Sequence, residues 1–350
     1  MAATDTKFKI NYYTLRDFET LKPVWDELAR GEEMTFFQSH DWYRMLVSRF
    51  PDDNSRWLTR FVVVSSGDGP VMLAPLWVVR RTFNIVNRKG VYFLGRQGWT
   101  DYLNFIYHTF DAGALDFLMK CVSRDFGIKS WTLELMKEGT SAFAHIQSRF
   151  SFQVHTITKC VALSLPDTVD DYHKSLSKSS RQNIRTAINR MTKDGIEPAV
   201  EFSLRDSVDT DTCIAMRAER VQQKNSRIHL GFATALRKRI TDALRFHPPV
   251  YFPLADCPAT RLLSIKDGDT LMAFFNYGLN PHTRQAVMMA VGTSDAHRRY
   301  SPGIVAMYKF ICDAIENNSL DSIDFTKGDE PYKYALGGKD HFIHSVRISL

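Results

Sequence analysis

The segment Asp321-Ser-Ile-Asp-Phe-Thr-Lys-Gly-Asp-Glu-Pro-Tyr-Lys-Tyr-Ala-Leu-Gly-Gly338 decides how the second half of the chain folds. A short apolar strand over 322–325 runs into a polar stretch rich in turn-forming residues. A short helix over 330–336 follows, with Asp329 as its expected N-cap and Pro331 in its first turn. This order is typical of an open α/β sheet, which binds ligands at the carboxyl ends of its strands.

The side chains of this segment can support proton transfer. Carboxylates can take a proton from an amine or a hydroxyl, and the candidates are Asp324, Asp329 and Glu330. Two phenols are candidate proton donors and one lysine is a candidate ligand for phosphate or carboxylate: Tyr332, Tyr334 and Lys333. A capped helix without a catalytic role accounts for some of the same residues, so both interpretations stay open.

A second segment, Ala296-His-Arg-Arg-Tyr-Ser-Pro-Gly-Ile-Val-Ala306, follows a strand over 285–290 and opens a helix over 302–316. A serine N-cap and a proline at the first helical position are expected at this start. Free N–H groups at a helix start bind phosphate, and glycine there lets a ligand approach the backbone. The candidate anion ligands are Arg298, Arg299, Ser301 and Gly303. A well-capped helix with surface arginines is the alternative.

A third segment, from residue 174 to residue 193, has six basic side chains and no acidic one. We expect one long helix over 170–192, with an apolar stripe that packs and a basic stripe beside it. The basic stripe consists of Lys174, Lys178, Arg181 and Arg185. Such a run is by default a solvated helix face, and an anionic partner is the alternative.

Both halves of the chain show the same order of expected elements: helices, then a hairpin, then strand, helix and strand. The apolar runs 61–64 and 71–79 flank a Ser-Ser-Gly-Asp-Gly-Pro turn, and a matching pair flanks Lys266-Asp-Gly-Asp269. We therefore expect a mixed α/β fold of two similar tandem domains, 1–158 and 159–350. Each is a mixed, mostly antiparallel sheet flanked by helices.

The composition excludes several classes of protein. The 350 residues are 44% hydrophobic and 24% charged, which is typical of a globular chain and excludes a disordered or fibrous one. The net charge of +6 is spread evenly, with no basic tail of the kind that binds nucleic acid. No apolar run approaches the ~20 residues of a membrane span, and the N-terminus has no apolar signal core. We therefore expect a cytoplasmic protein.

Metal and disulfide sites are not expected. The five cysteines are scattered and show no CxxC spacing, which fits reduced thiols. His341 and His344 alternate to opposite faces of a strand over 341–348, so they cannot ligate one metal together. The sequence also contains no GxSxG, HExxH, GxGxxG or P-loop motif.

Together these segments resemble the acyl-CoA acyltransferases of the GNAT superfamily. More narrowly, they resemble the cellulose-biosynthesis acetyltransferases, the CelD/BcsL-like group. The resemblance is carried by Asp324-Phe-Thr-Lys-Gly-Asp-Glu-Pro-Tyr-Lys333, by Tyr300-Ser-Pro-Gly303 and by Arg181-Gln-Asn-Ile-Arg185, and it is firm over 165–338. It implies two tandem GNAT-like domains, of which the second is the acyltransferase, and acetyl-CoA or another acyl-CoA as the donor.

In this family the donor pyrophosphate binds a glycine-rich turn, which aligns here with residues 300–305. This sequence departs from the family pattern, because only Gly303 remains, Pro302 removes one N–H and Tyr300 stands where a cation is usual. The donor-binding residues implied by the resemblance are Arg298, Arg299, Tyr300, Ser301 and Gly303, with Arg181 and Arg185 of the basic helix.

The resemblance also implies direct transfer of the acyl group to an amine or hydroxyl of an acceptor. The family branch suggests a sugar or polysaccharide precursor as that acceptor. Asp329 or Glu330 would remove the acceptor's proton, and Tyr332 or Tyr334 would protonate the leaving thiolate. Lys333 completes the set of catalytic candidates.

Two alternatives remain open. Tandem GNAT-like domains also occur in Fem-type peptidyltransferases, which take their acyl group from aminoacyl-tRNA, and the basic helix would then bind RNA phosphate. The chain could instead be a catalytically silent module that binds its ligand without turnover.

Overall fold

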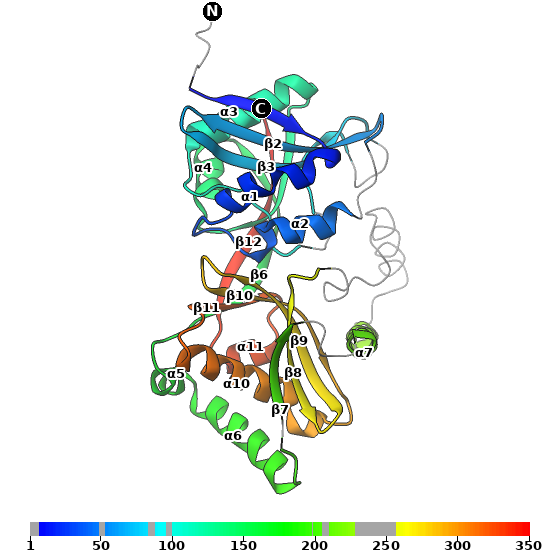
Figure 1. Cartoon of the computed structure of the whole chain (residues 1–350), viewed down its shortest axis with the longest axis vertical. Helices are drawn as coiled ribbons and strands as arrows, with labels where there is room; N and C mark the ends of the chain where they lie inside the picture. Colours follow the sequence, from blue (N-terminus) through cyan, green and yellow to red (C-terminus); the bar gives the residue numbers. More distant parts are fainter. Residues whose placement is uncertain are drawn as a thin grey trace, which may run out of the picture. The chain divides into compact units, whose positions relative to one another are not determined.

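The computed structural model describes residues 7–48, 53–82, 88–95, 100–197, 199–204, 210–227 and 257–350 (Figure 1). These residues fall in two compact units. The first unit contains the described residues up to Thr158 together with Phe342–Leu350. The second contains the described residues from Lys159 to His341. The sequence analysis placed 342–350 with the second domain, whereas in the structure this segment supplies a strand to the first unit.

In the first unit the strands lie in the order β1-β2-β3-β4-β5-β12. Neighbouring strands are antiparallel except β4 and β5, which are parallel. The β2–β3 hairpin confirms the turn signal in the sequence. The strands are β1 (Lys9–Tyr13), β2 (Trp57–Ser66), β3 (Gly69–Val79), β4 (Gly90–Phe93), β5 (Ser130–Lys137) and β12 (Lys339–Ser349).

Most helices of the first unit are short, and α3 (Ala112–Phe126) is the longest of those described. The sequence predicts one helix over 18–28, but the chain forms η1 (Leu15–Leu21), a 3-10 helix, and then α1 (Lys22–Leu28). Pro23 lies in the first turn of α1, because it has no N–H to continue the preceding turn. The remaining helices are η2 (Phe36–Gln38), α2 (His40–Val47), α3 (Ala112–Phe126) and α4 (Ser141–Arg149).

In the second unit the strands lie in the order β6-β11-β10-β9-β8-β7. Only β10 and β11 are parallel, and the other neighbours are antiparallel. The β8–β9 hairpin turns at Gly268, whose φ of +53° favours glycine. The strands are β6 (Phe152–Ser164), β7 (Ala199–Leu204), β8 (Arg261–Asp267), β9 (Thr270–Asn280), β10 (Gln285–Thr293) and β11 (Ser322–Lys327).

Two apolar clusters cover the two faces of this second sheet. The larger one packs α5 (Val169–Ser175), α6 (Lys178–Lys193) and α10 (Pro302–Glu316) against the strands. The smaller one lies under α7 (Thr210–Arg227), where Cys213 packs with residues of β8, β9 and β10. Helix α6 therefore buries one stripe, as the periodicity of the sequence predicts, whereas β9 is covered on both faces and is buried along most of its length.

The basic stripe predicted on one long helix is divided between two helices. Helix α5 ends at Ser175, and Ser177 caps α6 by accepting a hydrogen bond from the N–H of Ser180 at 3.0 Å. Ser competes well for this capping role, so the chain restarts its helix there. Lys174 therefore lies on α5, and only the later cations of the stripe lie on α6, which corrects the prediction.

Within the described ranges, none of the helices has both the length and the apolar composition needed to cross a membrane. The described residues also contain no group of three or more His, Cys, Asp or Glu side chains arranged to hold a metal ion.

Candidate functional site

The parallel strands β10 and β11 separate along their length. Their pairing begins at Gln285 with Ser322 and ends at Val287 with Asp324. Beyond this point β10 continues to Thr293, past a bulge between Met288 and Ala290, and β11 continues to Lys327. Parallel strands whose pairing stops before their carboxyl ends leave backbone groups without a ladder partner, and a ligand can bind these groups. This opening is the candidate site.

Thr326 links the two strands where they part. Its Oγ1 donates to the Met288 carbonyl of β10 at 2.9 Å, and its N–H donates to Asp324 Oδ1 at 2.8 Å. Its φ of +56° is uncommon for a β-branched residue. Strain of this kind costs about 1–3 kcal/mol and persists where the surroundings impose it, often at functional sites.

Asp324 is fully buried at this point, on the sheet face opposite the larger apolar cluster. Its neighbours Ile323 and Phe325 belong to that cluster, so alternation along β11 directs Asp324 to the other face. There its Oδ2 lies 3.5 Å from Nε2 of His341, whose side chain is 18% exposed. On the neighbouring strand β6 the residue paired with Asp324 is Ala162. An imidazole that a buried carboxylate orients has the geometry of a general base.

Lys333 fixes the loop between β11 and α11 (Pro331–Ala335). Its side chain is buried, and its Nζ donates to three backbone carbonyls at 2.8–3.3 Å, those of Thr326, Lys327 and Gly328. The same ammonium lies 3.0 Å from Glu330 Oε2. An ammonium has three N–H donors, and all of them are used inside the protein. Lys333 therefore positions the loop, whereas the sequence proposed it as an anion ligand.

The two carboxylates proposed as bases lie at the start of α11. Glu330 is the N-cap residue of α11, in place of the expected Asp329, which is exposed. The ion pair with Lys333 holds Glu330 against Gly328, where a Cβ would lie 2.6 Å from Glu330 Oε2. Only glycine fits there, since φ is also +101°.

The structure distinguishes the two candidate tyrosines. The Tyr332 ring packs against the larger cluster and meets Phe325 edge-on, with 6.3 Å between ring centroids. Burial, and then the negative charge of Glu330, raises the pKa of Tyr332 to about 12. Tyr334 is exposed and donates to Asp340 Oδ1 at 2.6 Å, and this hydrogen bond raises its pKa to about 12. The protonated phenol that faces inward is therefore that of Tyr332.

Two arginines of α7 lie beside the opening. Arg217 Nη1 donates to the Val291 carbonyl at 3.2 Å, and Arg220 Nη1 donates to Thr293 Oγ1 at 3.4 Å, both at the end of β10. Their positive charges lower the pKa of Tyr332, although less than burial raises it. Neither arginine could be predicted from the sequence, because no local pattern distinguishes two functional cations on an amphipathic helix from solvated ones.

The start of α10 lies next to the end of β10. Ser301 has φ of +49°, and its side chain makes no capping hydrogen bond, so the serine cap expected from the sequence is not formed. Pro302 has no N–H, and the N–H groups of Ile304 and Val305 bond to the Ser301 carbonyl. Among the described residues, the N–H of Gly303 is then the donor of this first turn that remains for a ligand.

Packing around Gly303 does not require glycine at this position. A Cβ there would lie 3.6 Å from Phe275 Cζ and 3.7 Å from Thr293 Oγ1, which is ordinary contact. Alanine would also favour the helix by up to about 1 kcal/mol. A glycine that the fold does not require is consistent with close approach of a ligand to this backbone.

The remaining predicted donor ligands serve the fold or point to solvent. Arg299 and Tyr300 both donate to Asp194 Oδ2 at 2.8 Å, and they tie η4 (Arg298–Tyr300) to the end of α6. Arg181 donates to the carbonyls of His173 and Leu176 at the end of α5. Arg298 and Arg185 are exposed.

The sequence of residues 178–334, from α6 into α11, matches the family model described as acetyltransferase (GNAT) domain. Among curated proteins, none matches this chain in sequence.

Solved structures share the fold at low sequence identity. FemX superposes with a TM-score of 0.60 at 11% identity, over 98% of this chain and 97% of FemX. A conserved protein of unknown function from Bacteroides thetaiotaomicron gives 0.55 at 12% identity, over 98% and 100%. A tandem GNAT protein from the clavulanic acid biosynthesis pathway gives 0.44 at 13%, over 97% and 98%. At these identities the likeness concerns the fold alone.

Proposed function

We propose, on the premise that residues 178–334 form a GNAT acetyltransferase domain, that this protein transfers an acetyl or longer acyl group from acyl-CoA to an amine or hydroxyl. The observation that carries the proposal is the opening between β10 and β11. A protonated phenol, Tyr332, lies there beside a helix start and two arginines. Acyl transfer needs these three parts: an anion-binding backbone, positive charge and a proton donor.

The donor's pyrophosphate is assigned to the start of α10. Gly303 offers a backbone N–H, and Thr293 joins this turn to Arg220, which brings a guanidinium to the same place. Guanidinium groups bind phosphate in two-point contacts, so Arg220 is a stronger candidate ligand than Arg299, which Asp194 already holds. Arg298, exposed just before the turn, is a second candidate.

The reaction balances with the residues present. The acceptor nitrogen or oxygen attacks the thioester carbonyl carbon, and its proton passes to a base. The C–S bond then breaks, and the thiolate takes a proton from the phenol of Tyr332. The proton held by the base returns to Tyr332 through solvent, so the products are the acylated acceptor and free thiol. The raised pKa keeps this phenol protonated at physiological pH.

The base that the geometry supports best is His341, with Asp324 behind it. The Asp324 carboxylate is buried and lies 3.5 Å from the imidazole, whose partial exposure leaves it reachable. Glu330 is engaged by Lys333 and Asp329 is exposed at the loop, so both are weaker candidates than the sequence suggested. Sugar or polysaccharide precursors remain the proposed acceptors, through the resemblance to the CelD/BcsL-like group.

Transfer from aminoacyl-tRNA is the second candidate, and the likeness of fold to FemX is the observation that favours it. The leaving group would then be a ribose hydroxyl, which Tyr332 can also protonate. The exposed cations of α6, including Arg185, would bind RNA phosphate. Affinity for tRNA that falls steeply between low and moderate salt would support this candidate over acyl-CoA.

The direct test compares Tyr332→Phe with Tyr334→Phe. The assay measures acetyl-CoA consumption against a panel of amines and sugars. We expect Tyr332→Phe to lower kcat by about 100-fold, within the range for loss of a general acid, with little change in acetyl-CoA affinity. Tyr334→Phe removes the same hydroxyl from an exposed position and serves as the matched control. Equal turnover in both variants would refute the assignment of Tyr332.

A further inference from the structure

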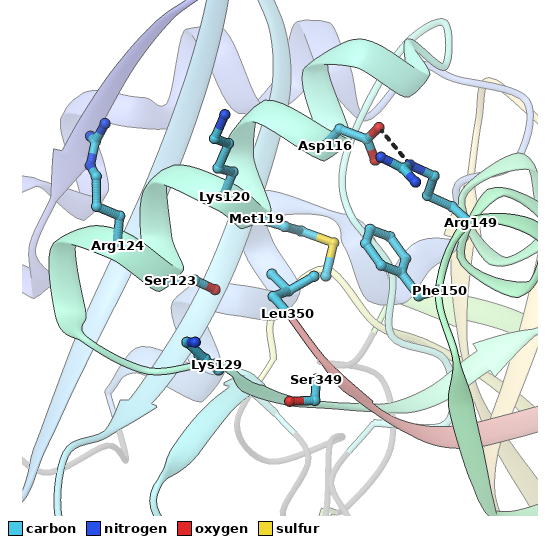
Figure 2. Close-up of a pocket in the computed structure, with 10 residues that line it drawn as sticks. All are labelled: Asp116, Met119, Lys120, Ser123, Arg124, Lys129, Arg149, Phe150, Ser349 and Leu350. Carbon is cyan, nitrogen blue, oxygen red and sulfur yellow. Dashed lines mark hydrogen bonds and ion pairs between the residues drawn. The ribbon is translucent and has the colours of Figure 1, made fainter. Parts of the chain in front are cut away.

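A pocket of about 490 Å³ lies wholly in the first unit, apart from the site proposed above. The carboxyl-terminal half of α3 forms one wall. The start of β5, the end of α4 and the last residues of the chain form the rest (Figure 2). Its volume falls within the range of about 300–1,000 Å³ that is usual for small-molecule sites.

The middle of the pocket is apolar. Figure 2 shows Met119, Phe150 and Leu350 gathered there, with the thioether of Met119 directed towards the Phe150 ring. Met119 is fully buried, whereas Phe150 and Leu350 are half-buried. A thioether and an aromatic ring adapt to apolar ligands of varied shape. This surface fits the apolar part of a ligand.

The charge around this apolar surface is mostly positive. Four cationic side chains line the pocket, Lys120, Arg124, Lys129 and Arg149, with one carboxylate side chain, Asp116. Asp116 contacts two partners: its Oδ2 lies 3.4 Å from Arg149 Nε, and its Oδ1 lies 2.8 Å from His145 Nε2.

The arginines and the lysines of the pocket differ in their partners. Arg124 Nε lies 2.7 Å from Oδ1 of Asp125, a residue that does not line the pocket, and Arg149 pairs with Asp116. Within the part of the chain that the structure describes, neither Lys120 nor Lys129 forms an ion pair. Two exposed ammonium groups beside an apolar surface attract an anion and disfavour a cation.

We propose that this pocket binds a small amphiphilic anion, in which a carboxylate or phosphate head is joined to a short apolar chain. The head contacts Lys120 and Lys129, and the chain contacts Phe150 and Leu350, behind which Met119 is buried. A neutral ligand would leave the ammonium groups without a partner, and a hydrophilic anion would leave the apolar surface exposed to water. The pocket is therefore distinct in place and in chemistry from the opening in the second unit.

The experiment titrates the 350-residue chain with four probes: octyl phosphate, octanoate, octanol and inorganic phosphate. Protein labelled on its methionine methyl groups reports binding through the Met119 signal, assigned with Met119→Leu. We expect octyl phosphate or octanoate to shift this signal saturably and at least 10-fold more tightly than octanol or inorganic phosphate. Comparison of the first two probes distinguishes a phosphate head from a carboxylate head.

Variants decide whether the lysines hold the head. Lys120→Gln with Lys129→Gln should weaken the tighter probe by 10-fold or more, since charge-assisted contacts are lost. Lys9→Gln, at an exposed position on β1, is the matched control and should bind as the wild type does. If the double variant is unstable, Lys129→Arg and Lys129→Gln make a pair at one position, and only the glutamine should weaken binding.

Three outcomes would overturn the proposal: an unmoved Met119 signal, octanol binding as tightly as the anions, or unchanged affinity in the lysine variants. None of these outcomes depends on acyltransferase activity, because every readout is binding to the first unit.

Discussion

The two units share the order of hairpin, strand, helix and strand but differ at the start of the helix between their parallel strands. In the first unit this helix is α3, and Asp111 caps it by accepting a hydrogen bond from the N–H of Ala114 at 3.0 Å. In the second unit it is α10, where the side chain of Ser301 makes no capping bond. A carboxylate satisfies a helix start and repels an anion, whereas an uncapped start can bind one.

The strand that follows this helix shows the same contrast. Leu135 in β5 and Thr326 in β11 both have positive φ, +62° and +56°. Two residues earlier, β5 carries buried Leu133 and β11 carries buried Asp324. The shared backbone conformation is thus occupied by apolar side chains in the first unit and by polar ones in the second. The comparison shows one backbone geometry with two kinds of side chain in the described residues, and it agrees with the proposal that the donor binds the second unit.

The largest expected effect comes from Asp324 and His341, since β5 carries Leu133 at the position that Asp324 has in β11. Asp324→Asn keeps the shape and the acceptor for the Thr326 N–H but removes the negative charge behind His341. We expect kcat to fall by about 100-fold, measured as acetyl-CoA consumption at saturating substrates.

Asp329→Asn is the control for that change, because this carboxylate is exposed on the same loop. Its turnover should stay within about twofold of the wild type. If Asp329→Asn lowers kcat more than Asp324→Asn does, the base is Asp329 at the start of α11.

The next largest effect comes from giving α10 the cap of α3. Ser301→Asp places a carboxylate at the helix start, and aspartate tolerates the left-handed backbone there. Repulsion of the pyrophosphate should weaken acetyl-CoA binding by about 10-fold or more, measured by calorimetric titration.

Ser301→Asn has the same shape without the charge and should bind nearly as the wild type does. If both variants lose the same affinity, charge at this position is not what distinguishes the two helix starts.

A smaller effect is expected at Gly303, where stability and binding should move in opposite directions. Gly303→Ala should raise the free energy of unfolding by up to about 1 kcal/mol, because alanine favours the helix and its Cβ meets no clash. The same methyl group should weaken acetyl-CoA binding a few-fold. Thermal unfolding and calorimetry test the two halves, and unaltered binding would separate Gly303 from the donor.

The smallest functional effect is expected in the first unit. Asp111→Ala removes the α3 cap and should lower the free energy of unfolding by about 1 kcal/mol. Acetyl-CoA affinity should stay within twofold of the wild type. If this variant bound a second acetyl-CoA, the Asp111 carboxylate alone would be what prevents acetyl-CoA from binding to the first unit.

Local signals predicted much of the fold. The turn residues around Gly67 and Gly268 predicted two hairpins, and Pro302 predicted the first residue of α10. The prediction failed at Ser177, where a serine cap divides the expected long helix, because serine is tolerated in both a helix and a cap. Residues 159–350 were assigned to one domain, yet Phe342–Leu350 belong to the first unit, since pairing with β5 is non-local.

The candidate site was predicted less completely, for the same reason. The segment around Tyr332 could be predicted from its local motif. The structure then distinguishes Tyr332, which is buried, from Tyr334, which is exposed. The proximity of Asp324 to His341 depends on strand order, and that of Arg220 to Thr293 on helix packing. The sequence proposed Lys333 as a ligand, because the sequence around it does not predict that its ammonium donates to three backbone carbonyls.

The stoichiometry of acetyl-CoA binding to the wild-type chain tests the central claim most directly. Calorimetric titration should give one acetyl-CoA per chain, and Ser301→Asp should weaken that single event while Asp111→Ala leaves it unchanged. Two bound molecules per chain, or one that persists undiminished in Ser301→Asp and weakens in Asp111→Ala, would contradict the assignment of the donor to the second unit.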